Sequence, residues 1–175
     1  MNKSKILLLL SILLTPFSTI AAVAHVHGVA TLQIALNDNL LHLYLSSPLE
    51  SLLGFEHQPR SEKQKAAVRH LTNQLHQAER LFQPTREARC KLITYSLESP
   101  ILETDMQKRH DHEKNDHADL FAEFVFDCAK PNELHDLEIN LFSYFSGLLR
   151  LKTETATPQG QSATILTPSK RRITW

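Results

Sequence analysis

Residues 27–45 read HGVATLQIALNDNLLHLYL, and this stretch decides the fold. Apolar residues alternate with polar ones on both sides of the Asn-Asp-Asn sequence at 37–39, a period of two that is typical of half-buried strands. A two-residue turn pairs the apolar residues of the two arms, Leu36 with Leu41 and Ile34 with Leu43. Because both apolar faces then coincide, the stretch predicts an antiparallel hairpin.

Further elements are expected along the rest of the chain. A short helix after Ser47-Pro48 ends near Gly54, and the capping box Ser61-x-x-Gln64 opens a long helix over about 62–81. Strands are expected at 89–97, 119–128 and 136–141, and a helical turn at 142–145. A last hairpin is expected with its two arms at 148–157 and 161–167. These patterns predict an α+β fold: a single domain, residues 25–175, of antiparallel strands packed by one long helix and short helices.

The first 24 residues are typical of a secretory signal peptide. Lys3 and Lys5 precede a short apolar run at 6–14, and small residues at 22–24 suit signal peptidase. The run is too short to span a bilayer permanently, and no second long apolar run follows. We therefore expect cleavage after Ala24, a periplasmic location and no membrane span in the mature chain.

Charge and motif content exclude several function classes. The chain has 19 Lys and Arg against 19 Asp and Glu, and loss of the two signal-peptide lysines leaves the mature part slightly acidic. Such a balance argues against a nucleic-acid partner. The chain contains no Gly-x-Ser-x-Gly, no His-Glu-x-x-His and no glycine-rich phosphate loop, so no enzymatic activity is predicted.

The two cysteines, Cys90 and Cys128, fall at the start of one expected strand and the end of the next. An oxidising compartment favours a disulfide between such a pair, and antiparallel pairing of the strands would bring the two ends together. The alternative is a pair of thiolate metal ligands.

Histidines form the strongest candidate site. His25 and His27 are two residues apart on an expected strand, so their imidazoles point the same way, and imidazole is a preferred ligand of zinc, copper and nickel. Cleavage would also free the α-amine of His25, which allows a planar Cu(II) or Ni(II) chelate with the imidazole of the third residue. Zinc prefers a tetrahedral site and would need ligands from elsewhere.

Two other segments could contribute ligands. The polar insertion at about 98–118 contains an eight-residue tract with three carboxylates and three imidazoles, those of His110, His112 and His117. Short His-rich tracts are candidates for weak metal binding, the alternative being a solvated loop. Glu56-His57 could be a ligand pair or a metal-supporting pair in a loop. The sequence leaves open whether His42 or His135 joins a site.

Several of these segments resemble ZrgA-type periplasmic zinc-binding proteins. Residues 24–30, Ala-His-Val-His-Gly-Val-Ala, match the family's opening, and residues 54–59, Gly-Phe-Glu-His-Gln-Pro, match its most specific segment. Cys90, Cys128 and residues 141–145 also fall where the family has comparable residues. The resemblance implies zinc binding by an ordered site of His25, His27, Glu56 and His57, with His110, His112 and His117 in a recruiting loop.

The expected function is therefore capture or buffering of divalent zinc in the periplasm and assistance to its uptake under scarcity. The expected partners are the metal ion and a zinc importer or its binding protein. Two alternatives stay open. One is copper or nickel binding through a free His25-Val26-His27 terminus, and the other is a structural or assembly factor of the periplasm that binds no metal.

Overall fold

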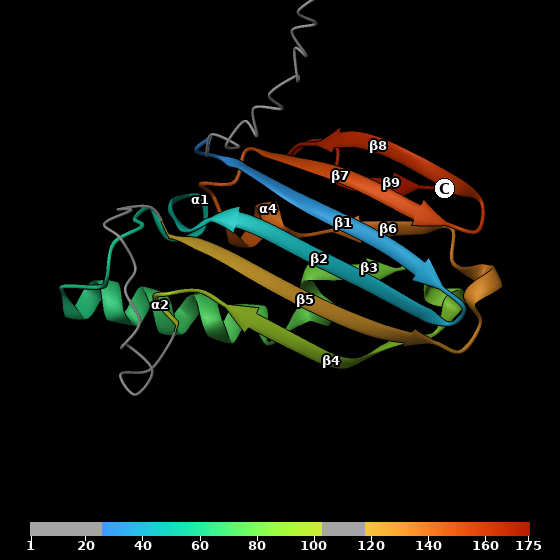
Figure 1. The fold of residues 1–175 in the computed structure, drawn as a ribbon, viewed down its shortest axis with the longest axis horizontal. Coiled ribbons are helices and arrows are strands. Elements are labelled where there is room, and N and C mark those ends of the chain that lie inside the picture. Colours follow the sequence, from blue (N-terminus) through green and yellow to red (C-terminus); the bar gives the residue numbers. More distant parts are fainter. Residues whose placement is uncertain (1–25, 103–117) are drawn as a thin grey trace, which may run out of the picture.

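The computed structural model describes residues 26–102 and 118–175. The predicted signal peptide, His25, and the tract with His110, His112 and His117 lie outside these ranges. A six-stranded sheet in the order β4-β5-β2-β1-β7-β8 crosses the front of Figure 1. Its strands are β1 (Val29–Asn37), β2 (Leu40–Pro48), β4 (Cys90–Glu98), β5 (Asp119–Cys128), β7 (Arg150–Thr157) and β8 (Gly160–Leu166).

A second sheet of three short strands lies behind the first in this view, in the order β3-β6-β9. Its strands are β3 (Phe82–Pro84), β6 (Asp136–Ile139) and β9 (Arg172–Thr174). The helices of the described part are α1 (Leu49–Leu53), α2 (Glu62–Leu75), α3 (Ala78–Leu81) and α4 (Leu141–Tyr144), with 3-10 turns at Arg86–Ala88 and Pro131–Glu133.

The hairpin formed by β1 and β2 has the register that the sequence predicts. Ile34 pairs with Leu43 and Leu36 with Leu41. Asp38 adopts a φ of 53°, the left-handed conformation that tight hairpin turns require and that aspartate tolerates. The predicted apolar face of both strands is buried. The prediction is confirmed because strand period and turn chemistry are both local properties of the chain.

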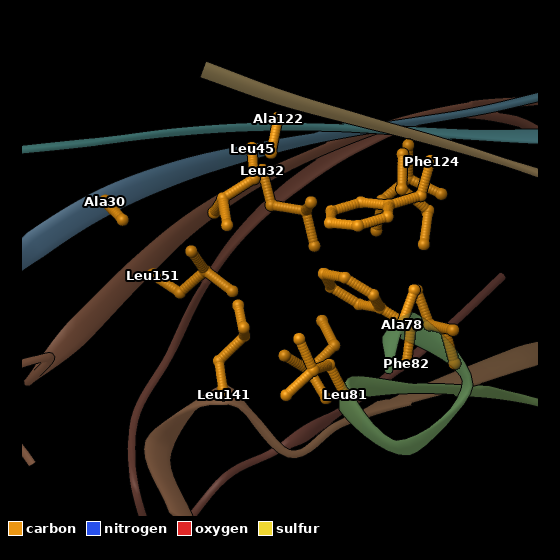
Figure 2. Close-up of a cluster of buried hydrophobic side chains, with 14 of the residues drawn as sticks. Ala30, Leu32, Leu45, Ala78, Leu81, Phe82, Ala122, Phe124, Leu141 and Leu151 are labelled. Carbon is orange, nitrogen blue, oxygen red and sulfur yellow. The ribbon is translucent and has the colours of Figure 1, made fainter. Parts of the chain in front are cut away.

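The core lies between the six-stranded sheet and the layer of α3, α4 and the small sheet. Figure 2 shows side chains of the large sheet, among them Leu32 and Phe124, pointing toward Leu81, Phe82 and Leu141 from the opposite layer. The rings of Phe82 and Phe124 are 5.2 Å apart at their centroids. All five side chains are fully buried, and burial of each stabilises the fold by roughly 1.5–3 kcal/mol.

The predicted fold class is wrong. Strands make up 47% of the structure and helical segments 24%, so the fold is mostly β with two sheets and short helices. The missed strands β3 and β9 have three residues each and pair with opposite sides of β6. A strand of three residues shows too little alternation to be recognised, so only its pairing partners define it.

The long helix predicted over 62–81 is also wrong. α2 ends at Leu75 after 14 residues, and Gln77 leaves the helical region, with φ −98° and ψ 46°, before α3 begins. Phe82 must already be extended because it pairs with Ile139 in the small sheet. The break redirects the chain into that sheet. Apolar spacing continues through the break, so the local pattern gives no sign of it.

The prediction that the strands are all antiparallel fails at the centre of the large sheet. β1 pairs in parallel with β7, from Val29 with Arg150 to Ala35 with Ala156. The chain returns to the start of β1 through α4 and the segment 145–149, and it enters β7 in the same direction as β1. Such a long-range pairing leaves no local signal, because both strands would alternate in the same way in either orientation.

Cys90 and Cys128 are directly paired between β4 and β5 and form a disulfide, as predicted. This bond rules out the alternative that the two thiolates are metal ligands. The amide of Cys128 also donates to the carbonyl of Asn39, 2.8 Å away, in the turn of the hairpin. The disulfide therefore links the edge strand β4 to β5 at the end of the sheet where the turn between β1 and β2 lies.

We expect the Ser61→Ala substitution to lower the free energy of unfolding by about 1 kcal/mol, the usual value of an N-cap. The Ser61 side chain accepts from the amide of Gln64, and the Gln64 side chain accepts from the amide of Ser61, which completes the predicted capping box. Urea unfolding of both proteins measures the difference. Ser61→Asp, which keeps an acceptor, should retain most of the stability, and equal losses in both variants would contradict the capping role.

Candidate metal site

His27 lies in the turn that leads into β1. Its side chain is 58% exposed, so packing alone does not hold it in place. The turn is closed by the amide of Val29, which donates to the carbonyl of Val26 over 3.1 Å. Gly28 adopts a φ of 76°, a left-handed conformation that favours glycine. The chain therefore presents the imidazole at one end of the sheet, away from the hairpin turn.

Glu50 lies beside His27 because both residues lie at the same end of the hairpin. The β1–β2 ladder runs from Asn37 with Leu40 to Thr31 with Ser46, so the chain before Thr31 and the chain after Ser46 leave it together. Glu50 is in the first turn of α1, which starts directly after β2. Figure 1 shows α1 next to the start of β1. The Glu50 Oε2 atom is 3.7 Å from Nδ1 of His27.

Glu56 approaches the same imidazole from the other side. It lies in the loop between α1 and α2, and its Oε1 atom is 3.7 Å from Nε2 of His27. Its side chain is only 9% exposed, in contrast to that of His27. The imidazole therefore sits between two carboxylates, one facing each ring nitrogen, and the structure brings together His27 and Glu56 as the sequence suggested.

The two ring nitrogens suggest different roles. A zinc ion bonds imidazole nitrogen and carboxylate oxygen at about 2.0–2.2 Å, so two ligands of a tetrahedral site lie about 3.4 Å apart. The 3.7 Å between His27 Nε2 and Glu56 Oε1 is close to this separation. A metal-bound histidine commonly donates its other N–H to a carboxylate, and Glu50 faces that second nitrogen. These residues thus fit a zinc ligand pair with a supporting carboxylate.

His57 follows Glu56, but its ring contacts residues of its own loop. Nδ1 is 2.8 Å from the carbonyl oxygen of Gln58, and the ring lies 5.4 Å from that of Phe55. A carbonyl can only accept a hydrogen bond, so Nδ1 carries the proton and Nε2 keeps the lone pair that a metal needs. His57 is therefore in a suitable tautomer, but it is not in contact with His27.

The two histidines that the sequence left open lie elsewhere. His42 is on the outer face of the large sheet, with Nδ1 3.5 Å from Glu123 Oε1. His135 precedes β6, with Nε2 3.7 Å from Asp136 Oδ2. Neither contacts His27 or Glu56. Each pairs with a single carboxylate, which is too few ligands for a tetrahedral zinc site.

Sequence reasoning missed Glu50. No motif marks it, because its closeness to His27 depends on the hairpin and not on spacing along the chain. A partial signal was present, since the predicted hairpin brings the chain before its first strand and the chain after its second strand to the same end of the sheet. Within residues 26–102 and 118–175, no group of three or more His, Cys, Asp or Glu side chains is already arranged to hold a metal ion. His27, Glu50 and Glu56 by themselves therefore do not form a complete metal site.

The fold is mostly β, and at one end of its large sheet an exposed imidazole lies between two carboxylates. The chain belongs to the ZrgA family of zinc uptake proteins, whose family model matches residues 24–175. The resemblance seen in the sequence is thus confirmed at the level of the family. No curated protein matches the chain. No helix in the described part of the chain is long and apolar enough to cross a membrane.

Proposed function

We propose that this protein captures zinc in the periplasm and passes it on for uptake when zinc is scarce. The observation that carries the proposal is the position of His27, whose two ring nitrogens each lie 3.7 Å from a carboxylate oxygen, of Glu50 and of Glu56. Membership of a zinc uptake family supports zinc as the metal. Binding and release of the ion are the whole activity, with no bond made or broken in a substrate.

The proposed roles of His27, Glu50 and Glu56 are supported by the distances between them, and those of the other histidines by the resemblance to the family. His27 Nε2 and Glu56 bind the ion. The Glu50 carboxylate, 3.7 Å away, moves closer to accept a hydrogen bond from the Nδ1–H group of His27 and so holds the ring in orientation. His57 supplies a further ligand through its available Nε2, after a movement of the loop that also carries Glu56. His25 completes the set by its position in the family's opening motif, and His110, His112 and His117 raise the local concentration of the ion.

Exposure of the site supports transfer rather than storage. A zinc ion bound through a side chain that is 58% exposed can exchange ligands with an approaching protein without unfolding of the sheet. We therefore propose an importer or its binding protein as the recipient. Signal-peptide cleavage after Ala24 would deliver the chain to the compartment in which that recipient works.

A chelator-competition titration of residues 25–175, with zinc and Cu(II) in parallel, tests the proposal. We expect sub-micromolar zinc binding and a zinc-dependent rise in melting temperature, because a ligand that binds only the folded state stabilises it. Tight binding of Cu(II) alone would favour the planar chelate of a free His25 terminus. Binding no better than that of a histidine-containing peptide, with no change in melting temperature, would leave a structural or assembly factor as the better explanation.

A further inference from the structure

A buried hydrogen bond joins the turn that carries His27 to the helix that carries Glu50. The amide of Gly28 donates to the Oγ atom of Ser51 over 2.9 Å. Ser51 is fully buried in α1 and directly follows Glu50. Gly28 directly follows His27, so this bond connects the two chain segments that place the imidazole and the carboxylate facing Nδ1.

The same turn is fixed from a second direction. The carbonyl of Gly28 accepts from the amides of Leu149 and Arg150, at 2.8 and 2.9 Å, where β7 begins. Gly147 packs against α1 so closely that a Cβ atom there would lie 2.6 Å from the carbonyl oxygen of Ser51. Three segments therefore meet at one closely packed junction next to His27.

From this junction we infer that Ser51 is a positioning residue of the zinc site. The inference rests on the proposed function. Ser51 touches no metal, but it holds the His27 turn at a set distance from Glu50. Because the imidazole is mostly exposed, its place is determined by the backbone of its turn and not by side-chain packing. Zinc bonds are short and their geometry is demanding, so a shift of the turn weakens binding even when every ligand is present.

The test compares Ser51→Ala with Ser47→Ala. Ser47 is a matched control, since it is also fully buried nearby, but its hydroxyl bonds to the carbonyl of Pro48 and not to the His27 turn. Zinc affinity is measured by chelator competition, and stability by thermal unfolding of the metal-free proteins. Cobalt(II) binding is followed by visible absorption, which reports coordination geometry and is insensitive to a loss of stability alone.

We expect Ser51→Ala to bind zinc about 10- to 100-fold more weakly than wild type, as for other residues that orient a metal ligand. Its cobalt spectrum should change, while Ser47→Ala keeps wild-type affinity and spectrum. Equal zinc affinities and spectra in the two variants would overturn the inference. Failure of the wild-type protein to bind zinc would instead overturn the proposed function, so the two failures are distinguishable.

A measurement on the wild-type protein covers the case in which Ser51→Ala does not fold. Hydrogen exchange of the Gly28 amide reports opening of its bond to Ser51. Zinc bound through His27 and supported by Glu50 opposes that opening, so saturating zinc should slow this exchange by about tenfold or more. The amide of Leu92, which donates to Glu79 at the edge strand β4, is the control and should not change. An unchanged Gly28 exchange rate would also overturn the inference.

Discussion

The His27→Ala substitution should weaken zinc binding by residues 25–175 more than about 100-fold, beyond the 10- to 100-fold loss typical of a supporting residue. The alanine removes the one side chain that lies between both carboxylates of the site. The loss should appear in a chelator-competition titration. Stability without metal should stay within about 0.5 kcal/mol of wild type, because the side chain is exposed and packs against little.

His42→Ala is the matched control for this substitution. His42 also faces a glutamate, with Nδ1 3.5 Å from Glu123 Oε1, and it is also partly exposed, but it lies on the outer face of the sheet. Its replacement should leave zinc affinity unchanged. Glu50→Gln should give an intermediate loss of about tenfold, in keeping with a support role. Equal affinities for the His27→Ala and His42→Ala proteins would place the zinc site elsewhere in the chain.

Replacement of both cysteines, Cys90→Ala with Cys128→Ala, should lower the free energy of unfolding by about 4 kcal/mol. The disulfide closes a loop with a sequence separation of 38. In the chain-entropy model, a cross-link over a loop of this size contributes about 4 kcal/mol to the free energy of unfolding, and its removal loses that contribution. For a chain of this length the melting temperature should fall by roughly 10 °C. Urea unfolding and a thermal scan measure the two quantities.

Reduction of the wild-type disulfide is the control for this double variant. Cys128 is almost fully buried, so alanine there also removes packing that the reduced protein keeps. Zinc affinity should be unchanged in both proteins, because the disulfide lies at the turn end of the hairpin and His27 at the opposite end. If the free energy of unfolding fell by less than about 1 kcal/mol in both the double variant and the reduced protein, the loop between the cysteines would already be compact in the unfolded chain.

The sequence predicted those parts of the site that depend on local order. The alternation of apolar and polar residues and the Asn-Asp-Asn turn were enough to predict the hairpin and its register. The opening motif at residues 24–30 pointed to His27 as a candidate ligand. The structure places the carboxylate of Glu56 3.7 Å from His27, while its role as a metal ligand stays a prediction. His57 was named from the same motif as Glu56, but its contacts in the structure are those of a loop residue. His25, His110, His112 and His117 stay predictions, because they lie outside the described residues.

The sequence by itself determined the hairpin register and indicated the pairing of the two cysteines, but it did not mark Glu50 as a neighbour of His27. The register and the cysteine pairing follow from interactions between strands that are neighbours in sequence, where one offset decides every contact. The tertiary structure alone decided the break after α2, the parallel pairing of β1 with β7 and the bond from Gly28 to Ser51. Each depends on segments far apart in the chain that meet only when the core closes, and their free energy comes from packing that no local pattern records.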